Sequence, residues 1–263
     1  MIIDFHTHCF PDKIADSAIK KLAYVAGGLI PQHDGTLSGL KELNRRTGID
    51  CSVVLNIATN PKQMTNVNNF AAEMNKEEGI IAFGSVHPDA PDALEELERI
   101  KEMGLKGVKF HPESQQFFTD DPKMKPIYRK ISELGLIVSF HAGRDYSFPA
   151  PYHNMPENMA GALKMLDCPV IAAHFGGVGG LDETIDKLCG LPLYFDTAFG
   201  YAQFAREEIM RFIDRHGADR ILFGTDAPWM NAEMIKSFLG SLELSEEEME
   251  MIKYKNAEKL LNK

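Results

Sequence analysis

Short apolar runs recur along the whole chain, and each is followed by a segment in which apolar residues have helical spacing. The runs are rich in β-branched and aromatic residues and are bounded by Gly, Pro or Asp. This composition is typical of strands that are buried on both faces of a parallel sheet. The expected strands are residues 2–5, 52–57, 80–86, 107–110, 136–140, 170–173, 193–195 and 220–223. Strands that alternate with helices predict right-handed βαβ units.

About eight such units in 263 residues predict a single-domain α/β protein, a (β/α)₈ TIM barrel over residues 1–263. A doubly wound open sheet is the alternative fold. It normally has a glycine-rich turn after its first strand, whereas this chain has His-Thr-His-Cys-Phe-Pro at residues 6–11. The connections 9–36 and 142–156 are long, and in a barrel such connections after strands cover the catalytic face.

The charge balance restricts the class of partner. The chain has 28 basic and 38 acidic residues, a net charge of −10 that argues against binding to nucleic acid or to anionic membranes. No apolar run approaches the roughly 20 residues of a membrane helix, and no signal peptide is expected at the N-terminus. The scattered cysteines are expected to be reduced thiols in a cytoplasmic protein.

Five polar residues with metal-binding side chains follow the predicted strands. His6 and His8 end the first strand, and their spacing of two places both imidazoles on the same side, toward the barrel interior. His141, His174 and Asp226 end the fifth, sixth and eighth strands. A lone His-x-His is usually incidental, and a lone His or Asp can cap the next helix. Because a barrel gathers its strand ends into one ring, the five together predict a metal site.

Five motifs carry a resemblance to a known family. They are Asp-Phe-His-Thr-His at residues 4–8, Lys-Gly-Val-Lys-Phe-His-Pro at 106–112, His-Ala-Gly at 141–143, His-Phe-Gly-Gly at 174–177 and Gly-Thr-Asp-Ala-Pro at 224–228. In this order the chain resembles the amidohydrolase superfamily. Within it, the chain is similar to the amidohydrolase-2 branch, which contains aminocarboxymuconate semialdehyde decarboxylase.

The resemblance implies one divalent metal ion, usually zinc, with manganese or iron as the other candidates. It implies that His6, His8, His141 and Asp226 bind the ion and that His174 is a catalytic acid or base. Three neutral imidazoles and one carboxylate leave the ion a net charge of about +1, which can lower the pKa of bound water toward 7. Asp226 is the second expected catalytic residue, because it can accept the proton of that water. A homodimer is a further expectation from the family.

Lys109 and His111 lie on one face of the fourth predicted strand. In several amidohydrolases a lysine on this strand is carboxylated and bridges two metal ions. We favour Lys109 as a cation in the barrel wall and His111 as a group that faces the substrate, and a carboxylated lysine is the alternative. The superfamily's metal-dependent deoxyribonucleases have a glutamate on this strand, and its absence here argues against a nuclease.

Other residues are weaker candidates for contact with substrate: Arg144, Tyr146, Asn56 and Trp229. The first two lie in the long connection after the fifth strand and can bind a carboxylate or a hydroxyl group, unless that loop is simply solvated. His33 and His87 are interpreted as surface or turn residues. Asp196, which ends the seventh strand, is interpreted as a helix cap.

Three functions remain open. The first is hydrolysis, in which metal-activated water attacks a small ester, lactone or amide. The second is non-oxidative decarboxylation of a small unsaturated or aromatic acid, with His174 or Asp226 supplying the proton to the carbon that loses CO₂. A decarboxylase should need a further cation for its acid substrate, for which Arg144 is one candidate. The third is a non-catalytic metal-binding protein. The first two use the same ligands and a small-molecule substrate.

Overall fold

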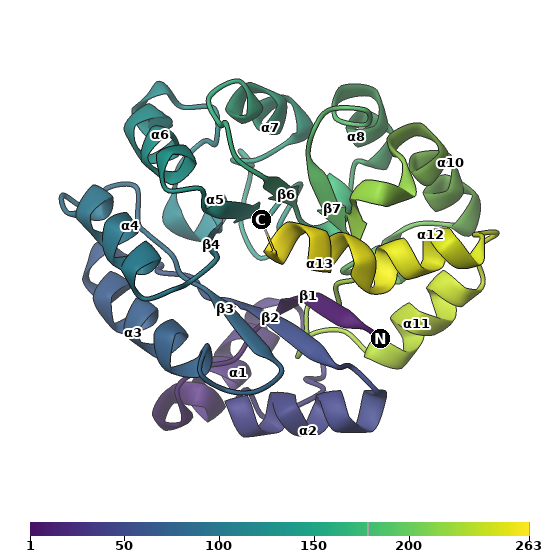
Figure 1. The fold of residues 1–263 in the computed structure, drawn as a ribbon, viewed down its shortest axis with the longest axis horizontal. Coiled ribbons are helices and arrows are strands. Elements are labelled where there is room, and N and C mark those ends of the chain that lie inside the picture. Colours follow the sequence, from purple (N-terminus) through teal and green to yellow (C-terminus); the bar gives the residue numbers. More distant parts are fainter. Residues whose placement is uncertain (178, 263) are drawn as a thin grey trace.

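The computed structural model describes residues 1–177 and 179–262 and contains eight parallel strands surrounded by helices (Figure 1). The strands are β1 Ile3–Thr7, β2 Cys51–Leu55, β3 Ile80–Phe83, β4 Gly107–Phe110, β5 Ile137–Phe140, β6 Val170–Ala172, β7 Tyr194–Asp196 and β8 Ile221–Leu222. Each lies within one of the predicted apolar runs or within a residue or two of it. The predicted order of strands is therefore confirmed.

The strands form two parallel ladders, β1-β2-β3 and β4-β5-β6-β7-β8. Isolated parallel bridges join these ladders at both edges, between Gly84 and Val108 and between Thr7 and Ala227. At the second junction the backbone N–H of His8 donates to the carbonyl of Ala227 over 2.7 Å. Each strand thus adjoins the next in sequence and the last adjoins the first, which is the arrangement of a (β/α)₈ barrel.

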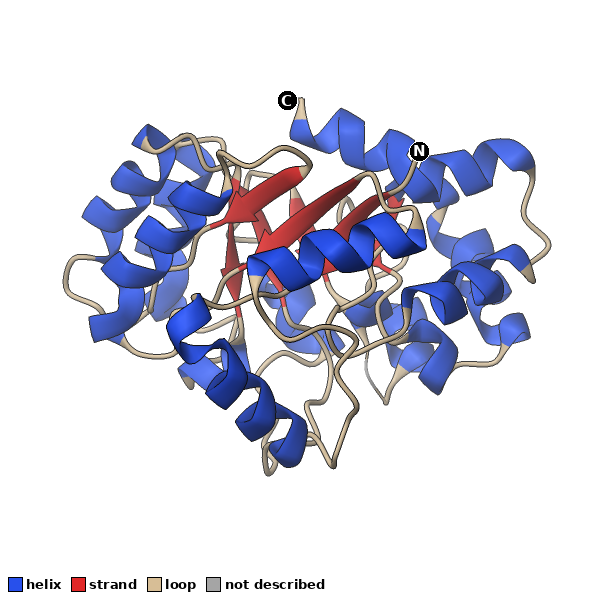
Figure 2. Cartoon of the chain, turned by 90° about the horizontal axis from the view of Figure 1, so that it is seen from below, coloured by secondary structure: helices blue, strands red, loops and turns tan. Residues whose placement is uncertain are grey.

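Helices follow the strands and lie outside them (Figure 2). They are α1 Asp12–Val25, α2 Leu37–Thr47, α3 Met64–Met74, α4 Ala93–Glu102, α5 Pro112–Gln115, α6 Lys125–Glu133, α7 Pro156–Leu163, α8 Leu181–Lys187, α9 Gly200–Gln203, α10 Arg206–His216, α11 Ala232–Gly240, α12 Glu246–Glu250 and α13 Asn256–Leu261. A π-helical turn, Met251–Lys255, joins the last two. No helix of the described residues has both the length and the apolar character of a membrane span.

Two apolar clusters make up the core. The larger one lies between the strands and the helices that follow them. The smaller one contains Phe5, Phe83, Ile171 and Leu222 from the strands and is joined by Leu260 of α13. The terminal helix crosses the strands beside the N-terminus (Figure 1). Apolar packing therefore closes that end of the barrel, and polar chemistry is left to the other end.

Both long connections are attached at the carboxyl ends of the strands. In the first, the backbone N–H of Gln32 donates to the carbonyl of Pro228 over 2.8 Å. In the second, the side-chain amide of Asn154 donates to the carbonyl of His141 over 2.7 Å. Pro228 follows β8 closely and His141 follows β5, so the two segments lie on the face where the sequence places the metal site.

Candidate metal centre

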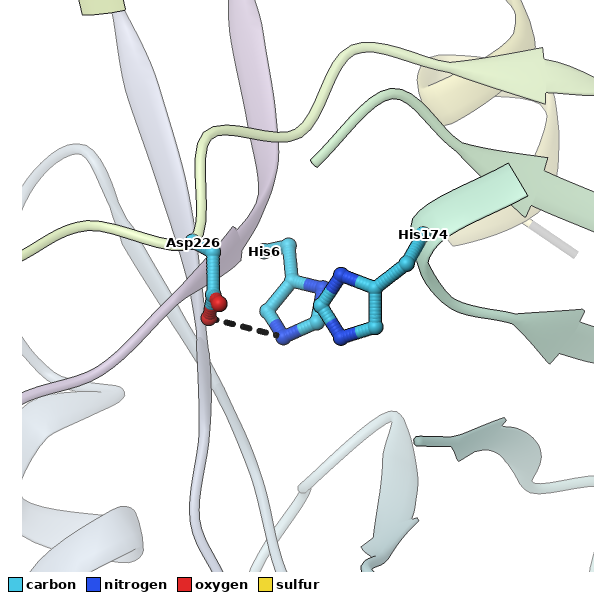
Figure 3. A group of neighbouring side chains, drawn as sticks. All are labelled: His6, His174 and Asp226. Carbon is cyan, nitrogen blue, oxygen red and sulfur yellow. Dashed lines mark ion pairs between the residues drawn. The ribbon is translucent and has the colours of Figure 1, made fainter. Parts of the chain in front are cut away.

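Two imidazoles and one carboxylate meet at the carboxyl ends of β1 and β8. The Nε2 atom of His6 lies 3.3 Å from Oδ1 of Asp226, and the Nε2 atom of His8 lies 3.0 Å from the same oxygen (Figure 3 for His6 and Asp226). Ligand atoms that are each about 2.0–2.2 Å from one ion are roughly 3–3.5 Å from one another. The Nε2 atoms of His6 and His8 therefore each lie at a distance from Oδ1 of Asp226 that suits a shared divalent cation.

A β-bulge in β1 aims the first of these imidazoles. Asp4 pairs with Ser52 and Thr7 pairs with Val54, so three steps along β1 match two steps along β2. The extra residue breaks the alternation of side chains between the two faces of the strand. As a result the side chain of His6 lies against Asp226, although the preceding residue, Phe5, belongs to the smaller apolar cluster.

The second nitrogen of each imidazole is already committed to an acceptor. His6 donates from Nδ1 to Oδ2 of Asp196 over 2.8 Å, and His8 donates from Nδ1 to the carbonyl of Leu55 over 2.8 Å. A neutral imidazole carries one proton, so a ring that donates from Nδ1 keeps a lone pair on Nε2. Both Nε2 lone pairs face Asp226. This is how metal-binding histidines are usually oriented, and the donor set therefore fits a metal ion.

Asp196 does more than the helix-cap interpretation allows. Its Oδ1 accepts from the backbone N–H of Ala198 over 3.1 Å, as a cap would, but also from the backbone N–H of His174 over 2.9 Å. Its Oδ2 accepts from His6. One fully buried carboxylate thus fixes both the ring of His6 and the backbone of His174. The only sequence signal for this role was a charged residue at the end of a strand.

His141 and His174 form a hydrogen-bonded pair next to this group. The Nδ1 atom of His141 lies 3.2 Å from Nε2 of His174. The other nitrogen of each ring is buried and has no hydrogen-bond partner among the described residues. If His141 donates within the pair, its Nε2 lone pair is free for a cation and His174 keeps a free N–H. If His174 donates, its own Nδ1 becomes the free lone pair. One ring nitrogen of His174 lies within 4.8 Å of ligand atoms of His6 and Asp226.

His174 and Asp226 both have left-handed backbone conformations, with φ of 59° and 60°. Such conformations cost roughly 1–3 kcal/mol in residues other than glycine and persist only where the surrounding structure enforces them. For Asp226 the enforcement includes a hydrogen bond of 2.7 Å from its backbone N–H to the carbonyl of His6. Strain at two residues of one candidate site is typical of functional positions.

Burial and mutual charge set the protonation states of the site. Burial and the charge of Lys109 lower the pKa of His6 to about 4, against the opposing effect of Asp196. Burial alone would raise the pKa of the Asp226 carboxyl, but His6 and His8 outweigh it and hold the pKa below its usual value. Near neutral pH the imidazole of His6 is therefore neutral and Asp226 is ionised, which are the forms that bind metals.

A second group of potential ligands lies beside the first but is less suited to a cation. His111 stacks on His141 with ring centroids 4.3 Å apart, and its Nε2 lies 3.4 Å from Oδ2 of Asp145. The Nδ1 atom of His111 accepts from the backbone N–H of Ser114 over 3.3 Å. The single proton of the neutral ring is then on Nε2, directed to Asp145, and no lone pair remains. Burial lowers the pKa of His111 to about 3, so the ring stays neutral.

Lys109 lies inside the barrel and is 1% exposed. Its Nζ atom is 3.5 Å from Oγ of Ser139, a long contact for a hydrogen bond. Burial lowers the pKa of the ammonium group to about 8, and the negative charges of Asp196 and Asp226 limit this decrease. The group is still mainly protonated at neutral pH, so it is a buried cation close to the two carboxylates.

The remaining substrate candidates differ in how their polar groups are used. Asn56 donates to the carbonyl of Phe83 over 2.9 Å, which ties β2 to β3. Trp229 donates its backbone N–H to the carbonyl of Asp226 over 2.8 Å. Arg144 and Tyr146 lie against the glycine-rich loop after His174: a Cβ atom at Gly179 would be 2.5 Å from the tyrosine hydroxyl and 3.2 Å from Cδ of the arginine.

His33 and His87 lie in turns, as expected, but neither ring is simply a surface group. Both rings accept a backbone N–H within a turn, from Gly35 and Asp89. However, His87 is only 7% exposed, and the Nε2 atom of His33 is buried. The sequence signals a turn at both positions, but burial depends on the segments that pack against them.

The family model described as amidohydrolase matches residues 3–263. The chain belongs to the amidohydrolase-2 family. The resemblance based on the five motifs is therefore confirmed. This family is metal-dependent. The chain is an enzyme, either a hydrolase or a carboxy-lyase. The alternative of a non-catalytic metal-binding protein is not retained. A search of curated proteins found no match.

Solved structures show the same fold over the whole length of this amidohydrolase. An uncharacterised TIM-barrel protein from Bordetella bronchiseptica has a TM-score of 0.80 and 19% identity, covering 99% of this chain and 98% of that one. The 5-carboxyvanillate decarboxylase of Sphingomonas paucimobilis has a TM-score of 0.73 and 14% identity, covering 99% and 98%. A dihydroxybenzoic acid decarboxylase from a Polaromonas species, with bound manganese and the inhibitor 2-nitroresorcinol, has a TM-score of 0.74 and 17% identity, covering 99% and 96%. The predicted TIM barrel is confirmed.

Proposed function

We propose that this amidohydrolase is a metal-dependent carboxy-lyase that removes CO₂ from a small aromatic or unsaturated acid without oxidation. The observation that carries the proposal is the contact between the donor group of His6, His8 and Asp226 and the pair of His141 and His174. A cation-binding group and a group able to carry a proton lie side by side in one buried site. The similarity in fold to two decarboxylases of aromatic acids supports the same reaction class.

One divalent ion would be held by His6, His8, His141 and Asp226. When bound, it would supply positive charge for the oxygen atoms of an acid substrate. Zinc suits three imidazoles and a carboxylate, and manganese is a further candidate because the Polaromonas decarboxylase contains it. Binding through His141 requires that its Nδ1–H donates to His174, which leaves a free N–H on the Nδ1 atom of His174.

Decarboxylation needs one proton for each CO₂ released. The electron pair of the broken carbon–carbon bond forms a carbon–hydrogen bond, and we assign the proton to His174. The alternative donor is Asp226, which would first have to take up a proton because its carboxyl group is ionised. Burial lowers the pKa of His174, so the free ring is neutral at pH 7. A bound anionic substrate opposes this shift and favours the protonated imidazole. Because that form also carries a proton on Nε2, its formation would end the hydrogen bond from His141. The protonated form of His174 is then available as the proton donor when the acid is bound.

Cations and polar groups around the site would orient the substrate. Lys109 offers a buried ammonium group, and Arg144 offers a guanidinium group whose planar geometry suits a carboxylate. His111 can contact a flat ring because it already stacks on His141. The other residues in this proposed set are Tyr146, Asn56 and Trp229.

Hydrolysis of a small ester, lactone or amide is the second candidate. The specific observation in its favour is the ionised carboxylate of Asp226, which contacts the Nε2 atoms of both His6 and His8. A carboxylate held in its basic form next to a cation site can accept the proton of an attacking water. The two candidates therefore differ in substrate and not in ligand set.

The test is a parallel assay of the metal-loaded protein. Loaded separately with zinc and with manganese, it is incubated with 5-carboxyvanillate, with 2,6-dihydroxybenzoate and with a set of esters, lactones and amides. We expect CO₂ release from at least one hydroxylated aromatic acid and none from the His174→Asn variant. Hydrolysis of an ester, lactone or amide without CO₂ release from any acid would replace the proposal by the second candidate.

A further inference from the structure

His33 lies in the first long connection, between α1 and α2. The turn that contains it is hydrogen-bonded to segments on two sides of the candidate site. The residue before it, Gln32, is bonded through its backbone N–H to the carbonyl of Pro228, two residues beyond Asp226. The carbonyl of Gly35 accepts the backbone N–H of Phe10, two residues beyond His8. Two separate backbone bonds thus hold this turn against the segments that follow β1 and β8.

The ring of His33 has a defined tautomer. Its Nδ1 atom accepts the backbone N–H of Gly35 over 3.0 Å. Burial lowers the pKa of His33 to about 4, so the ring is neutral near pH 7. A neutral imidazole whose Nδ1 accepts a hydrogen bond must carry its proton on Nε2. His33 therefore presents an N–H donor, and it cannot bind a metal ion through Nε2 in this state.

That donor has nothing to bond to in the described part of the chain. Only three buried side-chain nitrogen or oxygen atoms there lack a hydrogen-bond partner: Nε2 of His33, Nε2 of His141 and Nδ1 of His174. Two of the three belong to the candidate metal centre. The third lies in the turn that two backbone bonds hold against the segments after β1 and β8. Buried donors without partners are rare and call for a ligand or another explanation.

We propose that the Nε2–H group of His33 donates a hydrogen bond to an acceptor oxygen, carboxylate or phenolic, of the acid substrate held at the metal centre. The inference rests on the proposed function and extends it by a specificity-determining residue contributed by the first long connection. The substrate class is then an acid with at least two oxygen-containing groups. One of these groups faces the cation, and another faces the turn that contains His33. A neutral donor suits this role because its protonation does not change near neutral pH.

Two substitutions of the same residue separate the donor from the turn. His33→Asn keeps a side-chain oxygen that can accept the N–H of Gly35 but has no group at the position of Nε2. His33→Gln places an amide N–H₂ near that position and can restore the donor. His87→Asn is the matched control, since His87 accepts a backbone N–H in the same type of turn, and its pKa is shifted by burial, Asp89 and Lys123 instead of by residues of the site.

Binding is measured by calorimetry on the metal-loaded proteins, with 2,6-dihydroxybenzoate and 2-nitroresorcinol as probes. We expect His33→Asn to weaken binding of at least one probe by about tenfold or more, the usual effect of losing a hydrogen bond to a charged acceptor. His33→Gln should recover part of the loss, and His87→Asn should bind as the wild type does. Metal content should be equal in all four proteins, and the melting temperature of probe-free His33→Asn should stay close to that of the wild type, because an acceptor for the N–H of Gly35 is retained.

Three results would overturn the assignment. The first is equal probe affinity in wild type and His33→Asn, which would mean that solvent satisfies Nε2. The second is a loss of affinity that accompanies loss of metal or unfolding, which would make His33 a structural residue. The third is failure of the metal-loaded wild type to bind either probe. A wild type that binds the probes through His33 but releases no CO₂ from any acid would refute the proposed reaction and leave the role of His33 intact.

Discussion

The Nδ1 atom of His6, in β1, lies 2.8 Å from Oδ2 of Asp196, at the end of β7 on the other side of β8. This contact fixes which nitrogen of His6 faces Asp226. Burial would raise the pKa of the Asp196 carboxyl, but the neighbouring imidazoles of His6 and His174, together with Lys109, hold the pKa well below its usual range. The ionised carboxylate increases the electron density of the ring, which strengthens a metal ligand.

Asp196→Asn should therefore weaken metal binding by about 10- to 100-fold, the usual effect of removing such a partner. The amide keeps the shape of the carboxylate, so folding should be retained. The measurement is the metal content of purified protein during titration with a competing chelator. Glu96→Gln is the control, since Glu96 is 6% exposed and bonds to Asn68 and Arg99, away from the site. Equal affinity in wild type and Asp196→Asn would contradict this role.

The sequence predicts the barrel well because each strand is a compact apolar run. It also predicts the convergence of His6, His8 and Asp226, because strand order alone brings the ends of β1 and β8 together. The bulge in β1 and the left-handed backbone of Asp226 could not be predicted from the sequence. They depend on pairing between segments far apart in the chain, and no local residue pattern reports them.

The hydrogen-bond partners of the imidazoles could not be predicted from the sequence either. Asp196 has the local signature of a helix cap, and its bond to His6 spans 190 positions. The turn at His33 was predictable, but the burial of its Nε2 atom depends on packing of the first long connection against the loop after β8. Burial of a polar atom is a tertiary property, so residues of this type are found only when the fold is known.

One proton decides whether His141 or His174 is the third imidazole at the metal centre. The proposed function requires that His141 donates to His174. His141→Asn should then lose metal and activity together, because a neutral amide is a poor zinc ligand. His174→Asn should keep its metal and lose turnover by roughly 10²–10⁴-fold, the usual contribution of a general acid. Elemental analysis and single-substrate kinetics on both variants make the comparison.

The opposite pattern would reverse the assignment. If His174→Asn loses the ion and His141→Asn keeps it, then His174 replaces His141 as the third imidazole ligand; ligand atoms of His6, His174 and Asp226 already lie within 4.8 Å of one another. His141 would then be the proton donor.

The protein should bind one metal ion per chain. The second group, His111, His141 and Asp145, also has its ligand atoms within 4.8 Å of one another, but the backbone N–H of Ser114 uses the Nδ1 lone pair of His111. Asp145→Asn should therefore leave the metal content near one equivalent. Elemental analysis after purification without chelator is the measurement. Two equivalents in the wild type and one in Asp145→Asn would mean that the second group binds a metal as well.

Lys109 should make the metal-free protein less stable at neutral pH than at alkaline pH. Burial lowers the pKa of the folded-state ammonium from 10.5 to about 8. Below pH 8 the ammonium group is charged in the folded and in the unfolded state. The free energy of unfolding is then reduced by the full cost of burying this charge. Between pH 8 and 10.5 the unfolded chain binds more protons than the folded one, so the free energy of unfolding rises with pH. This contribution is about 3 kcal/mol.

Lys109→Met removes the charge and keeps the length of the side chain, so it should stabilise the metal-free protein near pH 7 by an amount of that order. The gain should shrink as the pH rises from 8 to 10.5. Urea unfolding of both proteins at several pH values gives the difference in free energy, in which the contributions of the cysteines cancel because they are common to both. A variant less stable than the wild type at pH 7 would show that Asp196 and Asp226 compensate the lysine charge fully, and that Lys109 holds the two carboxylates together.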